Sequence, residues 1–164
     1  MKKILILIVV VIVTIIGGFL IYTSDPYSVS GGVGVKEFAK RAIRNNDGAS
    51  CSKLKKFFAD VNNTEESLKI ECFSAVAVGL KDISLCENIP SALSKYLCYT
   101  DVAIATKNES LCDRIEPDDT IRPYGVAGRC FLILASIKKD ISICERILDL
   151  SDKDECKSFF NEFG

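Results

Sequence analysis

The sequence contains no histidine and no tryptophan among its 164 residues. Without histidine, the chain cannot use Ser-His or Cys-His nucleophile activation, histidine-bound zinc or the side chain that usually titrates near pH 7. It also lacks the C-x-x-C spacing of thioredoxin-like redox sites and the close cysteine pairs of most zinc sites. No set of residues forms a recognisable active site, so we predict no catalytic residue, no metal site and no cofactor.

The sequence also lacks a long run of basic residues, and its 21 basic residues nearly balance its 22 acidic residues. Beyond the apolar N-terminal segment, the remainder carries a net charge of about −3. A weakly acidic domain has no general attraction for nucleic acid, so we predict no nucleic-acid partner. The small cluster of Lys53, Lys55 and Lys56 is expected to be a solvated helix face.

One long apolar run sets the expected location. The 19 residues from Ile4 to Tyr22 carry no charge, and as a helix they would span roughly 28 Å, about one hydrocarbon core. Lys2 and Lys3 precede the run, so the positive-inside rule leaves the N-terminus in the cytoplasm. We expect a transmembrane signal-anchor at residues 4–22, by which the chain contacts the membrane as a single-pass protein.

A cleaved signal peptide is the alternative, and it would release the same domain as a secreted protein. The apolar run is longer than the roughly 7–15 residues of a signal-peptide core, and Phe19 to Thr23 is a poor cleavage site. Residues 23–34 are rich in Ser and Gly, so we expect a flexible linker there. An extracytoplasmic helical domain is then expected at residues 35–164.

All eight cysteines follow the apolar run, and they are the strongest signal in the chain. An even number of cysteines in an exported domain predicts disulfides rather than metal binding or free thiols. The expected disulfide residues are Cys51, Cys72, Cys86, Cys98, Cys112, Cys130, Cys144 and Cys156.

The cysteines belong to an internal repeat. Segments that begin at Cys72, Cys98 and Cys130 each carry a second cysteine 14 residues later and share the pattern C-[FY]-x-x-[VL]-A-x-x-x-K-[DN]-x-S-[LI]-C-[DE]-x-I. The repeats start 26 and then 32 residues apart, and the six extra residues fall near 116–121. Cys51 and Cys156 fit degenerate terminal copies, as expected of the caps of an array.

Each repeat is predicted to be a helical hairpin. Cys98, Tyr99, Val102 and Ala103 share one face of a helix, and the other repeats keep this spacing. The K-[DN] pair then ends the long helix and caps a short one, although the following Ser with an acid three residues later is an alternative capping box. We predict an all-α fold, an array of about four disulfide-linked hairpins after one transmembrane helix, with a leading amphipathic helix at residues 35–44.

The spacing leaves the disulfide connectivity open. One scheme ties each short helix to the following long helix and uses every cysteine; its bridges are Cys51–Cys72, Cys86–Cys98, Cys112–Cys130 and Cys144–Cys156. The alternative joins the pairs that are 14 residues apart, which leaves Cys51 and Cys156 at opposite ends. We favour the first scheme because it absorbs the variable connections inside the bridges.

The repeat resembles cysteine-bearing α/α-hairpin arrays in uncharacterised membrane-anchored prokaryotic surface proteins. The resemblance covers about residues 47–160 and rests on the pattern around the paired cysteines. It is also loosely similar to Sel1 and tetratricopeptide repeats, although the period differs and their Trp, Gly and Pro positions are absent. The resemblance implies a scaffold and brings no catalytic residues.

Other polar groups were weighed as sites. Glu116, Asp118 and Asp119 lack the spacing of a calcium loop, so a solvated inter-repeat loop is expected. Asn62 and Asn108 begin N-x-[ST] sequons for glycosylation, and Asn108 also fits a helix cap.

Three tyrosines are candidates for a recognition surface, namely Tyr96, Tyr99 and Tyr124. Tyr99, however, occupies the place of Phe73 and Phe131 in the repeat, so it is expected in the core.

These features favour a membrane-anchored extracytoplasmic structural or protein-binding module whose protein partner the sequence does not identify. The alternative is a cell-envelope enzyme that uses paired carboxylates, and thiol-based redox sensing is a third hypothesis. The sequence leaves an enzymatic role uncertain and favours a non-enzymatic one, since it cannot show two acids converging in a cleft.

Overall fold

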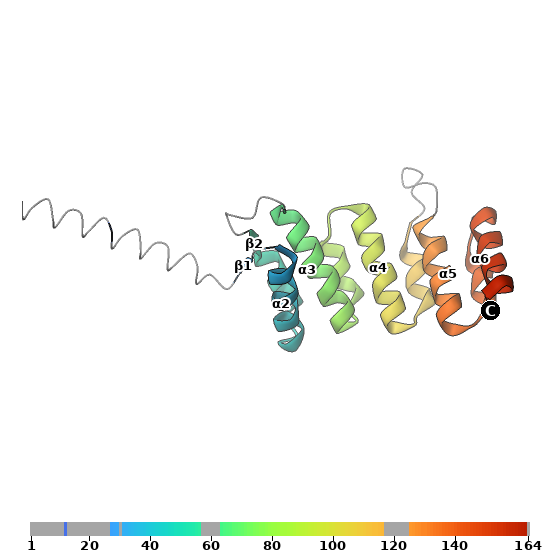
Figure 1. Cartoon of the computed structure of the whole chain (residues 1–164), viewed down its shortest axis with the longest axis horizontal. Helices are drawn as coiled ribbons and strands as arrows, with labels where there is room; N and C mark the ends of the chain where they lie inside the picture. Colours follow the sequence, from blue (N-terminus) through green and yellow to red (C-terminus); the bar gives the residue numbers. More distant parts are fainter. Residues whose placement is uncertain (1–11, 13–26, 30, 57–62, 117–124, 164) are drawn as a thin grey trace, which may run out of the picture.

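A computed structural model describes residues 12, 27–29, 31–56, 63–116 and 125–163. In these residues five α-helices alternate with four short 3-10 helices (Figure 1). The α-helices are α2 (Gly31–Arg44), α3 (Glu65–Leu80), α4 (Ala92–Thr106), α5 (Val126–Lys138) and α6 (Leu150–Phe163). The 3-10 helices are η1 (Gly48–Lys53), η2 (Ile83–Asn88), η3 (Glu109–Arg114) and η4 (Ile141–Arg146). The predicted all-α class is confirmed, and each short helix of the repeat is a 3-10 helix.

The elements form an extended array. Figure 1 shows the α-helices standing side by side in sequence order, and neighbouring α-helices are in contact. Each of η2 and η3 contacts both the α-helix before it and the one after it. The array therefore grows by adding one α-helix and one 3-10 helix at a time, as in other repeat proteins.

The K-[DN]-x-S motif builds the turn inside each repeat. Lys81 has a left-handed backbone with φ of 56°, and the N–H of Asp82 donates to the carbonyl of Ala77 at 2.9 Å. These features form a Schellman ending of α3. The Asp82 carboxylate then accepts from the backbone N–H of Ser84 at 2.9 Å and from its hydroxyl at 2.6 Å.

The same turn recurs in the next two repeats. Lys107 and Lys139 are also left-handed, with φ of 53° and 56°. Asn108 and Asp140 cap the helices that follow them. The Asp or Asn is thus the operative cap, and the serine is its partner rather than the first residue of a capping box.

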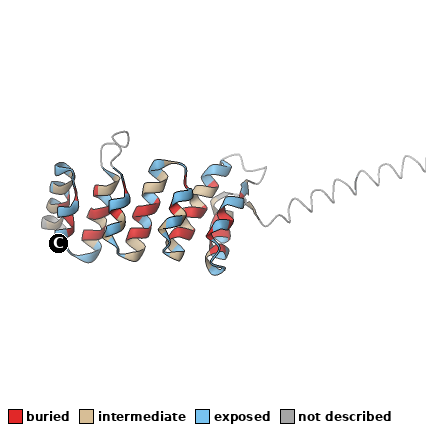
Figure 2. Cartoon of the chain, turned by 180° about the vertical axis from the view of Figure 1, so that it is seen from behind, coloured by how far each residue is buried: buried red, intermediate tan, exposed pale blue. Residues whose placement is uncertain are grey.

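The helical face predicted from the repeat is buried. Val102 and Ala103 of α4, with Leu134 and Ala135 of α5, are 0% exposed. Figure 2 shows the buried residues at mid-height in successive helices, so the core runs along the array. Ala103 and Ala135 have small side chains, which allow the neighbouring elements to approach closely.

Four disulfides cross this core in the favoured pairing. They are Cys51–Cys72, Cys86–Cys98, Cys112–Cys130 and Cys144–Cys156. Each joins a 3-10 helix to the α-helix that follows it, and all eight cysteines are 0% exposed. The bridges therefore lie across the junctions between repeats, where they connect successive elements of the array.

The predicted linker at 23–34 is wrong for much of its length. Ser28–Val29 forms strand β1, which pairs in parallel with β2 (Lys55–Lys56), and α2 begins at Gly31. Val35 is 0% exposed, and the rings of Tyr27 and Phe38 lie 6.0 Å apart. This packing offsets the low helix propensity of the glycines. The composition of the segment shows only that low propensity and gives no sign of the packing. Residues 23–26 and 30 lie outside the described residues.

The other N-terminal predictions have separate outcomes. The helix expected at 35–44 is present within α2. Apart from Ile12, the predicted transmembrane segment at 4–22 lies outside the described residues and stays a prediction. None of the helices in the part of the chain that the structure describes is both long and apolar enough to cross a bilayer.

Candidate functional site

The cysteines are structural rather than reactive. All eight lie among the described residues, and none carries a free thiol. Their complete burial keeps the sulfur atoms away from solvent. This arrangement provides no thiolate for the redox-sensing hypothesis, because such chemistry needs an accessible thiol of low pKa.

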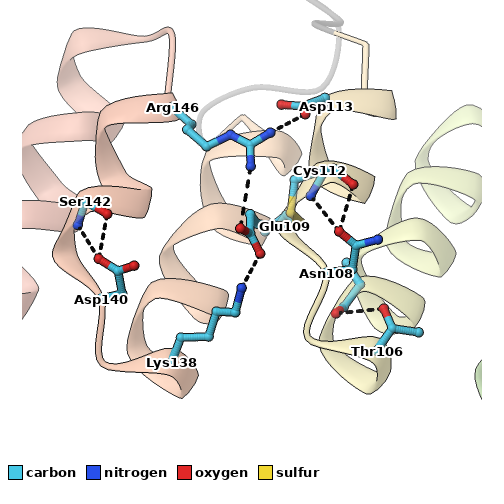
Figure 3. Close-up of polar contacts among 12 residues, drawn as sticks. Thr106, Asn108, Glu109, Cys112, Asp113, Lys138, Asp140, Ser142 and Arg146 are labelled. Carbon is cyan, nitrogen blue, oxygen red and sulfur yellow. Dashed lines mark hydrogen bonds and ion pairs between the residues drawn. A yellow bond between two sulfur atoms is a disulfide. The ribbon is translucent and has the colours of Figure 1, made fainter.

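A ladder of charged side chains runs along the surface of the junctions. Figure 3 shows Glu109 of η3 between Lys138 of α5 and Arg146 of η4, with Arg146 also paired to Asp113. The guanidinium carbon of Arg146 lies 5.2 Å from the centre of the Phe131 ring. The hydrogen bond from Lys138 is the main cause of a lowered Glu109 pKa. The elements η3 and α5 are thus joined by salt bridges as well as by the Cys112–Cys130 disulfide.

The preceding junction has the equivalent rung. Glu87 of η2 accepts a 2.6 Å hydrogen bond from the hydroxyl of Tyr99, and this bond is the main cause of its lowered pKa. Burial, with help from Glu87, raises the pKa of Tyr99 to about 12. Arg114 of η3 lies over the Tyr99 ring at 6.0 Å and 3.9 Å from Glu87. An acid, an aromatic ring and an arginine from the next repeat therefore meet at both junctions.

The last α-helix changes this pattern. Lys157 of α6 occupies the position of Tyr99 and Phe131, and it pairs with Glu145 at 2.6 Å. The salt bridge with Glu145 accommodates the charge at this position. This polar substitution is the kind expected of a capping repeat.

A cleft of about 370 Å³ lies where η3, α5 and the connection from η4 to α6 meet. Its apolar lining includes Ile115, Val126, Phe131 and Ile147. Three of these side chains, those of Ile115, Phe131 and Ile147, belong to the hydrophobic core. The cleft therefore reaches the core between two repeats. We call it the α5 cleft.

The rim of the α5 cleft is acidic. Asp113, Glu116, Asp149 and Asp152 line it, and Arg146 is the one basic side chain among its described lining residues. Leu148, also on the rim, is 88% exposed. Apolar depth with a charged edge is the usual character of a site that binds a ligand or a peptide.

The cleft exists because α5 starts late. Relative to the disulfide cysteine, α3 begins seven residues earlier and α4 six, whereas α5 begins only four residues before Cys130. Two residues before that cysteine the repeats carry Ile70, Tyr96 and then Gly128. The shorter helix leaves space at this junction, and the place next to Gly128 is taken by a side chain from α6.

Asp152 explains why glycine is needed there. A Cβ on Gly128 would lie 2.5 Å from the Oδ2 atom of Asp152, so a side chain and this carboxylate exclude each other. Gly125, the N-cap of α5, supplies no side-chain hydrogen bond, unlike Thr64 of α3 and Ser91 of α4. Asp152 places a negative charge against this first turn, whose N–H groups carry partial positive charge.

The residues singled out from the sequence are distributed unevenly. Glu116 and Tyr96 line the α5 cleft, whereas Tyr99 lies in the core as expected. Asn108 caps η3. Asp118, Asp119, Tyr124 and Asn62 lie outside the described residues.

The predicted helix face formed by three lysines is not helical throughout. Lys53 ends η1 and lies 5.6 Å from the centre of the Tyr27 ring, whereas Lys55 and Lys56 form β2. The short strand replaces the expected helix because it pairs with β1, a contact across the chain that the local sequence does not signal.

The sequence did not single out Asp149, Asp152 or Leu148 as members of one site. The available signal was the interrupted period near residue 116 together with the glycines at the start of α5, which mark a departure from the repeat. The sequence did not show that the connection from η4 to α6 lies next to this irregular start of α5.

The acids of the cleft are mostly solvated. Asp113, Glu116 and Asp149 are exposed, and Asp152 is half-buried. Asp149 accepts a hydrogen bond from the Asp152 N–H at 3.0 Å, so it serves the start of α6. Within the described ranges no group of three or more His, Cys, Asp or Glu side chains could hold a metal ion. The geometry is that of a charged binding rim.

No protein-family model, curated protein or solved structure matches this chain. The resemblance to Sel1 and tetratricopeptide repeats therefore stays a prediction.

Proposed function

We propose that this protein is a membrane-anchored extracytoplasmic scaffold that binds another protein through its helical array. Two features support the location. Four disulfides in the folded domain indicate an oxidising environment. The uncharged run from Ile4 to Tyr22, preceded by Lys2 and Lys3, has the length and flanking charge of a signal-anchor.

The observation that carries the binding role is the α5 cleft beside exposed leucines. Leu148 and Leu150 are 88% and 74% exposed, and Leu148 lines the cleft. A large apolar side chain that is exposed at the edge of a cleft favours a contact that removes it from water. Disulfides at every junction keep this surface in one shape, which lowers the entropy lost on binding.

The location is tested with the full chain expressed in a host with an oxidising exterior. We expect the protein to remain with the membrane after alkaline carbonate washing and to be degraded by protease added to intact spheroplasts. Non-reducing peptide mapping of the same material should return the four bridges. Full release into the medium would favour cleavage, and protection from protease together with free thiols would overturn the proposed location.

The binding role is tested by placing a photo-activated cross-linking residue at Leu148 of the full chain in intact cells. A scaffold should give one discrete adduct with an extracytoplasmic protein. The matched control carries the same group at Leu93, which is exposed on α4 and outside the cleft. No adduct from either position, or equal and diffuse adducts from both, would contradict the role.

The cell-envelope enzyme remains the second proposal because four carboxylates line one cleft. A general acid needs a carboxyl that holds its proton near neutral pH. Carbon-13 NMR titration of the aspartate and glutamate carboxyls measures this directly. A rim carboxyl that is still protonated at pH 6 would favour the enzyme, whereas complete ionisation of all four would favour the binding role.

A further inference from the structure

We propose that the α5 cleft is a peptide-recognition site for an apolar side chain flanked by lysine or arginine on a partner protein. This inference rests on the proposed scaffold role and adds the chemistry of what the scaffold binds. It follows from three independent features of the junction, namely its apolar lining, its uneven charge and its departure from the neighbouring repeat.

The apolar lining specifies the central residue of the ligand. Ile115, Phe131 and Ile147 line the cleft, and Val126 closes one side. The volume of about 370 Å³ falls at the low end of the ~300–1,000 Å³ typical of ligand pockets. Leu148 stands at the edge with most of its surface in water. A leucine-sized side chain in the cleft would also cover Leu148 and remove both from solvent.

The charges specify the flanking residues. Arg146, the basic residue of the described lining, is already committed to Glu109 and Asp113 and lies over the Phe131 ring. Glu116 has no ion-pair partner among the residues that the structure describes. The edge is therefore negative, and a cationic segment would find attraction there while an acidic one would be repelled.

The neighbouring junction shows how this array recognises a cation. There Arg114 lies over the Tyr99 ring and near Glu87, so a guanidinium, an aromatic face and a carboxylate already combine. In that repeat Tyr96 occupies the position that Gly128 holds in α5. The α5 junction keeps the internal arginine, but the carboxylate of Asp152 lies next to Gly128 where the neighbouring repeat has an aromatic ring. A cation from a partner would meet this carboxylate at the cleft.

The test uses the full chain in detergent micelles and three fluorescein-labelled peptides followed by fluorescence anisotropy. The first is Ser-Lys-Leu-Lys-Ser, the second replaces both lysines with glutamate, and the third replaces the leucine with serine. We expect the first peptide to bind at least about tenfold more tightly than either of the others, a ratio worth ~1.4 kcal/mol. Its affinity should fall as salt increases, because part of the attraction is between solvated charges.

Two variants locate the binding. Leu148→Ser and Glu116→Gln alter exposed side chains, so both should fold, and each should weaken the first peptide about fivefold. The matched controls are Leu93→Ser and Glu66→Gln, which make the same changes outside the cleft and should leave affinity unchanged. Circular dichroism and non-reducing peptide mapping check the fold of every variant.

Several outcomes would overturn the inference. They are equal binding of the lysine and glutamate peptides, unchanged affinity of the two cleft variants, or no binding of any peptide at 1 mM, roughly the −4 kcal/mol limit of a useful contact. A dimer of the full chain that Leu148→Ser dissociates would also overturn it, by assigning the cleft to a second copy. If such a result accompanies a retained partner adduct in cells, the scaffold role stands and only the cleft chemistry fails. Peptide binding without any cellular adduct would contradict the scaffold role instead.

Discussion

The α4 and α5 junctions use the same framework but present different surfaces. Both have a disulfide from the 3-10 helix to the α-helix, the K-[DN]-x-S turn and an arginine over an aromatic ring. At α4, the helix begins six residues before its disulfide cysteine and carries Tyr96 two residues before that cysteine. At α5, the helix starts later, and Gly128 lines the cleft.

This difference teaches that the framework and the surface are separable in this array. The disulfides, the turn and the buried alanine face hold one repeat on the next whether or not the first turn of the α-helix is filled. A binding surface can therefore be created by changing a few residues at a helix start, without loss of the interactions that stabilise the array.

The largest expected effect on stability comes from removing the disulfide at each junction. Cys86→Ser/Cys98→Ser opens a link with a sequence separation of 12, and Cys112→Ser/Cys130→Ser opens one of 18. We expect each pair to lower the free energy of unfolding by on the order of 3 kcal/mol, with slightly more for the longer loop. Urea unfolding under non-reducing conditions measures both. A much smaller loss at α5 alone would show that the cleft has already weakened that junction.

The next test concerns Gly128 and Asp152. Gly128→Ala should cost about 1–3 kcal/mol of stability, because the added methyl group meets the Asp152 carboxylate. The double variant with Asp152→Ala should lose much less than the sum of the single variants, since the obstructing group is gone. Thermal unfolding of the four proteins gives this coupling. Strict additivity would mean that the two residues do not contact each other as described.

A smaller effect is expected at the caps that both junctions share. Asp82→Ala and Asn108→Ala each remove an acceptor for the backbone N–H and hydroxyl of the serine two residues later. Each should lower stability by about 1 kcal/mol. Asn108→Asp is the matched control and should be nearly neutral, because Asp82 and Asp140 already perform this role. A large loss in the control would point to a separate need for the Asn108 amide.

The smallest effect is the pH dependence of the stability that Glu87 and Glu109 contribute at the two junctions. The folded-state pKa of Glu87 and of Glu109 lies below the ordinary value of 4.5, through hydrogen bonds from Tyr99 and Lys138 respectively. Their contribution is therefore present above about pH 4.5 and is lost as the pH falls through the folded-state pKa. Both carboxylates are well solvated, so each should contribute at most about 1 kcal/mol.

Thermal unfolding followed from pH 7 to pH 3 measures this contribution. The melting temperature should stay nearly constant down to about pH 5 and then decline. Glu87→Gln and Glu109→Gln should each make that decline shallower, because the variant has no carboxylate to protonate. A decline that is equally steep in the variants would assign the acid sensitivity to other groups.

Much of the fold could be predicted because it is local or repeated. The offsets of Val102 and Ala103 from Cys98 defined the buried face, and three aligned copies strengthened that inference. The sequence left two schemes of cysteine pairing open, and the structure has the favoured one, which uses all eight cysteines across the variable connections. The role of Asn108 was anticipated as one of two caps, and the structure selected it because its side chain lies within reach of two donors on Ser110.

The candidate site could be predicted only in part. Glu116 and Tyr96 were noted, but for a solvated loop and for a general recognition surface. Nothing in the local sequence connects them with Leu148 or Asp152, which come from a different repeat. The linker prediction at the start of α2 was wrong for the same reason, since the glycines suggested a linker and the local sequence does not show that α2 contacts α3.

The sequence by itself determined the repeat, its helical period, the capping turns and an oxidising destination for the domain. These depend on side chains within a few residues of one another and on the count and position of the cysteines. Only the tertiary structure decided that a cleft would form between the late start of α5 and the connection into α6. Only the tertiary structure placed acidic residues from both segments around that cleft. The physical reason is that a cleft is formed by surfaces from separate repeats, whose approach depends on how far each neighbour extends and which side chains fill the gap.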